Sequence, residues 1–179
     1  MKKQVMAIST ILLIVLSVGI TSAWFLASAS RANEFKMGTV KVKVVEEGFE
    51  DLENVEATSY NKNVQVKSLG TKRTYVRVRL VPGWSNPSLP VSNVMLNLAG
   101  NSDWILYTDG YCYYKYYLTE NQETSLLLQS VTFTELGKEY EGETFKLHVL
   151  AEGVQITNNG WQDVWGLTSL PFTPGIPKP

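Results

Sequence analysis

Apolar and polar residues follow two different patterns along the chain. Residues 5–20 are almost wholly apolar and contain no charged side chain, whereas from Gly38 onward apolar residues recur at every second position. The first such run places polar residues between three valines, Val40, Val42 and Val44. A period of two directs one set of side chains toward a core and the other toward water, as in a half-buried β-strand. The pattern therefore predicts an apolar N-terminal segment followed by a β-sheet domain.

Further alternating runs predict several more strands. One run contains Val64 and Val66, and the next contains Val76, Val78 and Leu80. The connection between them, residues 69–72, is expected to form a hairpin in which Gly70 takes a positive φ. The other candidates are residues 92–98, 104–108, 111–118, 126–134 and 144–154, with a short closing piece at 161–165.

Turn residues separate these candidates. Asp109-Gly110 is a strong tight-turn dipeptide between two of them, and Pro82, Pro87 and Pro90 mark a loop between strands. We find no amphipathic helix in this part of the sequence. Short strands separated by turns indicate an all-β fold, an antiparallel β-sandwich of the jelly-roll or immunoglobulin-like kind.

The apolar N-terminal segment is typical of a signal helix. Met1-Lys2-Lys3 supplies a short positive region, and the apolar run is shorter than the roughly 20 residues of a membrane-spanning helix. Thr21 and Ala23 are small residues at the −3 and −1 positions of a cut before Trp24. A second candidate cut follows Ala29, and an uncleaved membrane anchor is the alternative to both. Export is expected in either case.

Composition and charge narrow the class of protein. The chain has 179 residues with 44% hydrophobic and 18% charged residues, which indicates one globular domain with a real core. A cut after Ala23 leaves 14 basic against 17 acidic residues, a net charge of −3, and no basic stripe for nucleic acid. Cys112 is the single cysteine, so no internal disulfide forms. An exported domain without disulfides is commoner in Gram-positive bacteria than in animal secretions.

The sequence carries little that predicts an enzyme. His148 is the single histidine, and no His-Glu-x-x-His spacing is present for zinc. His148 is expected on the solvated side of its strand, and Cys112 as a buried structural thiol rather than a nucleophile. We therefore expect no catalytic residue, no metal and no cofactor. The acidic residues do not show calcium-loop spacing and are expected on a solvated face: Glu46, Glu47, Glu50, Asp51, Glu53, Glu56, Asp103 and Asp109.

Two segments suggest surface roles. The run "YTDGYCYYKYYL" predicts a surface aromatic patch of Tyr111, Tyr113 and Tyr117, which could stack on glycans or pack between subunits. The alternative is a hairpin whose tyrosines cover the sheet with their hydroxyls in water. Residues 167–179 hold four of the chain's prolines and are expected to form an extended, mobile tail.

Several stretches together resemble the TasA/camelysin family of exported proteins. They are the apolar run ending in small residues, Asn33-x-Phe35-x-x-Gly38-Thr39, "SLGTKRTYVRVRLVPGW", "LNLAGNSDWILYTDGYCYYKYYL", "TFKLHVLAEGVQ" and "GWQDVWG". The resemblance implies a jelly-roll domain that builds extracellular fibres or surface layers of a biofilm matrix. It also implies a dedicated signal peptidase of the endoplasmic-reticulum type, which cuts before the aromatic pair Trp24-Phe25. The chain departs from the family in Leu26-Ala27-Ser28-Ala29-Ser30, where many members carry an Asp-containing segment.

The segment between signal and sheet offers a route to assembly. Trp24 to Phe35 lies outside the first clear strand and begins with the apolar residues Trp24, Phe25 and Leu26. An extended segment of this kind can add a strand to the open edge of a neighbouring subunit. Such a contact is heterologous, so repeating it gives an open filament. The alternatives are a frayed terminus and a segment that folds back on its own domain.

The expected organisation is thus a signal peptide (1–23), a candidate donor strand (24–37), a β-sandwich domain (38–166) and a proline-rich tail (167–179). The expected function is that of a secreted structural protein in an extracellular matrix or on the cell surface. Its partners would be copies of itself or homologous matrix subunits, besides the signal peptidase, and it would meet the membrane only through an uncleaved signal. The alternative function is a cell-surface binding module for glycan or calcium.

Overall fold

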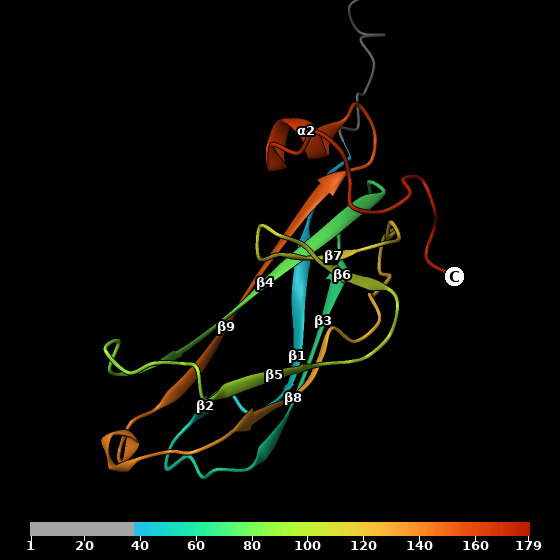
Figure 1. Ribbon diagram of the computed structural model, residues 1–179. Coiled ribbons are helices and arrows are strands. Elements are labelled where there is room, and N and C mark those ends of the chain that lie inside the picture. Colours follow the sequence, from blue (N-terminus) through green and yellow to red (C-terminus); the bar gives the residue numbers. More distant parts are fainter. Residues whose placement is uncertain (1–37) are drawn as a thin grey trace, which may run out of the picture. The chain divides into compact units, whose positions relative to one another are not determined.

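The computed structural model describes residues 38–179, which fold into two antiparallel β-sheets (Figure 1). The first sheet contains, in spatial order, β1 (Val42–Gly48), β3 (Ser59–Ser68), β8 (Leu128–Phe133) and β5 (Val94–Leu98). The second contains β2 (Asp51–Leu52), β9 (Phe145–Gln155), β4 (Thr74–Trp84), β7 (Cys112–Tyr114) and β6 (Trp104–Leu106). The expected all-β, antiparallel, sandwich-like fold is therefore confirmed. The predicted signal peptide and candidate donor strand lie outside the described residues.

The core lies between the inner faces of the two sheets. Alternate residues of β3 and β4 point into it, and Val64, Val66, Val76 and Val78 are fully buried. At one end the core is aromatic: Phe133 of the first sheet packs edge-on against Phe145 of the second, with ring centroids 4.7 Å apart. Burial of these side chains supplies the main favourable free energy of folding.

The predicted hairpin between β3 and β4 is wrong. The two strands belong to different sheets, so residues 69–73 cross between layers instead of closing a ladder. Gly70 does not have a positive φ either. It is needed because the chain passes close by: a Cβ at Gly70 would lie 2.2 Å from the carbonyl oxygen of Thr39. The N–H groups of Leu69 and Gly70 both donate to the carbonyl oxygen of Lys41, at 2.8 and 3.1 Å.

The predicted turn at Asp109-Gly110 is confirmed. It joins β6 to β7, which pair antiparallel, and Gly110 has φ +80°. The Gly110 N–H donates to the carbonyl oxygen of Tyr107 at 3.0 Å, and the Tyr111 N–H donates to Oδ1 of Asp109 at 3.0 Å. Both strands are shorter than the alternation suggested, because the chain leaves the sheet on each side of the turn.

The predicted closing strand at 161–165 is also wrong, because this segment is the helix α2 (Gly160–Trp165). Asn158 and Asn159, with φ +57° and +51°, turn the chain out of β9. Gly166, with φ +68°, ends the helix and donates its N–H to the carbonyl oxygen of Gln162. A single 3₁₀ turn, η1 (Lys138–Tyr140), precedes β9. Within residues 38–179, no helix has the length and apolar character needed to cross a membrane.

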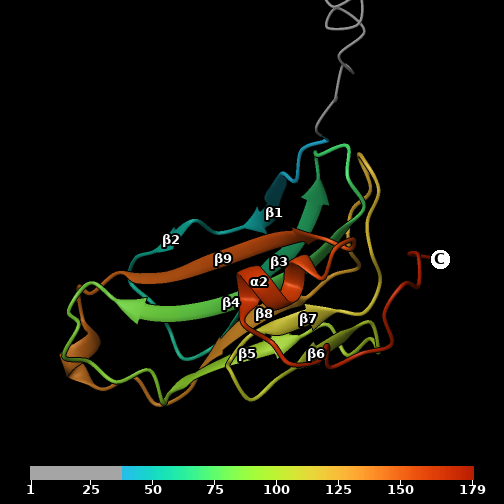
Figure 2. The same cartoon turned by 90° about the horizontal axis from the view of Figure 1, so that it is seen from above.

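The proline-rich tail packs on the second sheet. The sequence predicts a mobile tail and does not predict these contacts. Leu167, Leu170 and Phe172 lie against a buried cluster on the outer face of that sheet. Figure 2 shows α2 in front of β4 and β9, with the tail continuing from it. One end of the outer face is thus covered, although no third sheet is present in the described part of the chain.

Candidate functional site

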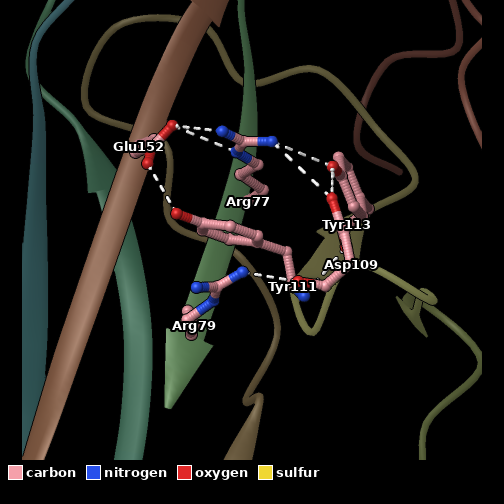
Figure 3. A network of polar contacts seen from close by, with 6 residues as sticks. All are labelled: Arg77, Arg79, Asp109, Tyr111, Tyr113 and Glu152. Atoms are coloured by element: carbon pink, nitrogen blue, oxygen red, sulfur yellow. Dashed lines mark hydrogen bonds and ion pairs between the residues drawn. The ribbon is translucent and has the colours of Figure 1, made fainter. Parts of the chain in front are cut away.

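The outer face of the second sheet carries a polar network centred on Arg77 of β4 (Figure 3). Arg77 is directly opposite Glu152 of β9 on one side and Tyr113 of β7 on the other. Its Nε and Nη2 donate to Oε2 of Glu152 at 3.0 and 2.8 Å, and Nη1 donates to the Tyr113 hydroxyl at 3.1 Å. Cross-strand register alone therefore brings these three side chains together.

The β6–β7 turn joins the same network. The Tyr113 hydroxyl donates to Oδ2 of Asp109 at 2.6 Å, and the same carboxylate lies 3.8 Å from Nη1 of Arg77. Arg79 donates from Nη2 to the backbone carbonyl oxygen of Asp109. The Tyr111 hydroxyl donates to Oε1 of Glu152 at 2.9 Å. The turn is thus fastened to β4 and β9 by its own residues Asp109 and Tyr111 and by Tyr113 of β7.

The two arginines also contact aromatic rings. Arg77 Cζ lies 4.0 Å from the ring centroid of Tyr111 and 4.9 Å from that of Trp165, and Arg79 Cζ lies 4.2 Å from the Tyr111 ring. Figure 3 shows the Tyr111 ring between the two guanidinium groups. Close contact of a guanidinium with an aromatic face is favourable, most of all where water is excluded. Arg77 is only 9% exposed.

Burial and hydrogen bonding in this network shift the pKa values of its tyrosines and of Arg77 upward. Burial and the hydrogen bond to Asp109 together raise the pKa of Tyr113 to about 12, although Arg77 acts in the opposite direction. The hydrogen bond to Glu152 raises the pKa of Tyr111. Burial lowers the pKa of Arg77, but its hydrogen bonds to Tyr113 and Glu152 outweigh this, so the net direction is upward. Near neutral pH the tyrosines therefore stay protonated and the arginine stays charged, so neither kind of side chain acts as a general base there.

The predicted surface aromatic patch is therefore corrected. Tyr113 has no exposed surface, and Tyr111 is half-buried between the two arginines. Tyr117 is half-buried beside the tail, with Arg73 Cζ 5.5 Å from its ring centroid. Tyr111 and Tyr113 hold the β6–β7 turn against β4 and β9, whereas Tyr117 contacts the tail. The charged partners that bury them come from strands distant in sequence, and sequence reasoning did not connect them.

His148 and Cys112 lie where the sequence predicts. His148 is exposed on the outer face of β9, whereas Phe145 and Leu147 point into the core. Cys112 is buried on the inner face of β7, and burial raises the pKa of its thiol to about 11. A thiol with such a pKa holds almost no thiolate at neutral pH, so it is a poor nucleophile.

The acidic residues between Glu46 and Glu56 are exposed, as expected, on β1, on β2 and in the turns beside these strands. Glu46 lies on β1 and contacts the buried Lys62 of β3, with Oε2 and Nζ 2.6 Å apart. Asp51 lies on β2 and contacts Lys146 of β9, also at 2.6 Å. Across residues 38–179, no group of three His, Cys, Asp or Glu side chains is placed to hold a metal ion.

The strand β9 has an open edge. It pairs with β4 along its whole length, but on its other side β2 pairs only with Lys146 and Phe145. Nothing else in the described part of the chain pairs with residues 147–155 on that side. This edge lies beside a pocket of about 300 Å³ that Leu147, Lys62 and Glu46 help to line.

The hydrogen-bonding direction along this edge follows from β4. Pro82, which the sequence places in a loop, instead lies within β4, where it has no N–H and pairs with Leu147. Thr74 uses both its N–H and its carbonyl for Leu118, each at 2.9 Å, and it pairs with Gln155. Because neighbouring residues of a strand point their N–H groups to opposite sides, the odd-numbered residues of β9 point theirs away from β4. Between Leu147 and Gln155, these outward groups belong to Val149, Ala151 and Gly153.

The predicted signal-cleavage residues Thr21, Ala23 and Trp24 lie outside the described residues, as do the candidate donor-strand residues Phe25, Leu26 and Phe35. In comparisons with protein-family models, with curated proteins and with solved structures, no match to this chain was found.

Proposed function

We propose that the chain is a secreted structural protein, a subunit of extracellular biofilm-matrix fibres or of a surface layer, which assembles by strand donation between subunits. The observation that carries this proposal is the open edge of β9, where β2 covers only Lys146 and Phe145. Outward N–H and carbonyl groups of such an edge favour pairing with another chain.

The donor in this proposal is the segment Trp24–Phe35. It precedes the first strand, begins with Trp24, Phe25 and Leu26, and ends with Phe35. Extended along β9, it would add main-chain hydrogen bonds and place alternate side chains over the gap between the sheets. Contact of one subunit's N-terminal segment with another's β9 is head-to-tail, so assembly continues as an open filament.

Two further observations support a structural role. The polar network on the second sheet fastens the hairpin, and its Tyr113 stays protonated near neutral pH because its pKa is raised to about 12. The motifs that resemble the TasA/camelysin family form long parts of β9, which has the open edge, and of its neighbour β4. On this reading the sandwich is a jelly-roll, and cleavage before Trp24 releases the donor segment outside the cell.

Deleting residues 24–35 tests the donor. The truncated chain should stay folded, because both sheets and the core lie within residues 38–179. It should not form fibres, and it should shorten the fibres of the full mature chain when the two are mixed, because it accepts a strand but donates none. Filament length in electron micrographs measures this, with circular dichroism as the check of folding. Fibres of normal length from the truncated chain alone would contradict strand donation.

Ala151→Pro tests the acceptor edge. It removes an N–H that points away from β4, so the ladder between β4 and β9 is kept while the open edge loses a donor. Ala151→Ser is the matched control, because it keeps the N–H and a small side chain. We expect fibres from the control and none from the proline variant, with similar circular dichroism spectra. Equal assembly of the two would rule out this edge as the acceptor.

A further inference from the structure

The outer face of the second sheet carries aromatic side chains that the tail covers. Tyr75 of β4 is 2% exposed and Trp165 of α2 is 8% exposed. The Phe172 ring of the tail meets the Tyr75 ring edge-on, with centroids 5.3 Å apart and planes at 72°. Leu167 and Leu170 pack on the same cluster. We call Tyr75, Tyr117 and Trp165 the tail-binding surface.

Main-chain hydrogen bonds hold the rest of the tail. The Gly175 N–H donates to the Tyr75 hydroxyl at 2.7 Å. Tyr117 donates its N–H to the carbonyl oxygen of Ile176 at 3.0 Å, and its own carbonyl accepts from the Lys178 N–H at 3.2 Å. Tyr117 and Pro177 thus form a parallel β-bridge. Aromatic contacts combined with such bonds are the way in which proteins bind extended, proline-rich peptides.

The tail is suited to leave this surface and to return to it. Prolines at 171, 174, 177 and 179 restrict its φ angles, so an extended form costs less conformational entropy than in an ordinary segment. Its contacts are few: Leu167, Leu170 and Phe172 are partly buried, and Ile176 is 42% exposed. Partial burial of an apolar side chain contributes about 1 kcal/mol, similar to the cost of ordering one residue. The free energy of docking the tail is therefore close to zero. Gly166, with φ +68°, lies where the tail leaves α2.

We propose that the tail-binding surface is a binding site for an extended proline-rich segment, and that its occupant in trans is residues 167–179 of a second copy of this chain. The copy's tail carries the same apolar side chains and backbone groups that fit the surface within one chain. Exchange of identical tails therefore keeps each contact and adds a link between two domains. This link is independent of strand donation at β9.

A labelled peptide with the sequence of residues 167–179 tests the site. The protein is residues 38–179, which contain both sheets, and the acceptor variant is Leu170→Ala with Phe172→Ala, whose own tail is weakened. We expect fluorescence anisotropy to give saturable binding to the variant, with Kd on the order of 10 µM to 1 mM. Binding to the unchanged protein should be weaker, by about twofold for a Kd of about 1 mM and by more for a lower Kd, because its own tail competes at millimolar effective concentration.

The control peptide carries Phe172→Ala and should not bind. No binding of the natural peptide to a folded acceptor variant would overturn the proposal, as would equal binding of the two peptides. Near-ultraviolet circular dichroism checks the fold. Gly175→Pro is a second acceptor: it removes the N–H that bonds Tyr75, and proline cannot adopt the φ of +82° at this position. It weakens only the end of the tail, so it should fold and should also bind the peptide more tightly than the unchanged protein.

Mixing two copies tests the occupant. Acceptor variant and unchanged protein should form a heterodimer that sedimentation velocity detects. They are combined above the Kd that the peptide shows for the unchanged protein, because the donated tail must first leave its own surface. The same mixture with Phe172→Ala in both chains should remain monomeric. A mixture with the unchanged protein that stays monomeric would overturn the assignment to a second copy.

Discussion

The two faces of the second sheet are both buried at its centre, but by different means. On the inner face, Val76 and Val78 of β4 pack against the first sheet and have no exposed surface. On the outer face of the same strand, Tyr75 and Arg77 are 2% and 9% exposed beneath α2, the tail and the β6–β7 turn. Apolar contacts alone bury the inner face. On the outer face Arg77 needs charged and hydrogen-bonding partners, because burying a guanidinium without them costs free energy.

The difference shows what can bury a sheet face that no second sheet covers. The partners Tyr113, Asp109 and Glu152 surround Arg77 and satisfy its hydrogen-bond donors. The Trp165 ring covers the Arg77 guanidinium. Farther along the sheet the cover ends: Leu150 is 50% exposed and Val81 37% exposed. Burial of the outer face is thus local and depends on a few side chains, whereas burial of the inner face is continuous.

The largest effect should come from the inner face. Phe145→Ala removes a fully buried ring that packs on Phe133 and Trp84, with centroids 4.7 and 5.3 Å away. We expect a loss of about 3–5 kcal/mol in the free energy of unfolding, because a cavity replaces many contacts. Urea denaturation monitored by far-ultraviolet circular dichroism measures it. A loss below 1 kcal/mol would mean that the aromatic end of the core is not the main source of stability.

The second effect is the dependence of stability on pH, which tests the outer face through Tyr113. The pKa of Tyr113 rises from 10.0 to about 12, so folding favours the protonated form. This stabilisation is complete below pH 10 and is lost as the pH rises toward 12, by roughly 3 kcal/mol for a shift of about two units. Tyr113→Phe should be less stable near neutral pH by about 1 kcal/mol, since two hydrogen bonds are lost. Its stability should fall less steeply above pH 10 than that of the unchanged protein, in urea denaturation at each pH.

The control for this series is Cys112→Ala, since the Cys112 thiol also titrates late, with a pKa of about 11. The cysteine variant should keep the fall between pH 10 and 12 that belongs to Tyr113. Equal slopes for the tyrosine variant and the unchanged protein would show that this hydroxyl does not govern the alkaline limb.

Alternation along the sequence predicts the inner face well, because a period of two is a local property. Val64, Val66, Val76 and Val78 lie where the pattern places them, and the turn at 109–110 follows from its own two residues. Alternation does not specify which strands pair. The strands β3 and β4 are neighbours in sequence, yet they lie in different sheets because their partners, β8 and β9, are distant in the chain.

The outer face was missed for the same reason. Tyr113 looks solvent-facing in sequence, since its cover comes from Trp165 and from Arg77, at positions that only the tertiary fold brings near. The pairing of Arg77 with Glu152 depends on the register of β4 and β9. The helix α2 is six residues long and begins after two asparagines at positive φ. Too few residues are available there for a helical period to be visible.

The last of these effects concerns the charge at the centre of the outer face. Arg77→Met keeps an unbranched side chain of similar length against Tyr111 and Trp165, but it removes every hydrogen bond to Glu152 and Tyr113. Breaking a fully buried ion pair costs about 3–5 kcal/mol, and we expect about 2 kcal/mol here, because water can reach the Glu152 carboxylate once its partner is gone. The Glu152 side chain is 40% exposed. Arg77→Met combined with Glu152→Gln should recover part of the loss, since no unpaired carboxylate then remains. Urea denaturation of the two single variants and the double variant gives the coupling energy between the residues. If the double variant loses as much as the two single losses added together, the ion pair does not hold the outer face, and packing of Trp165 and the tail alone accounts for its burial.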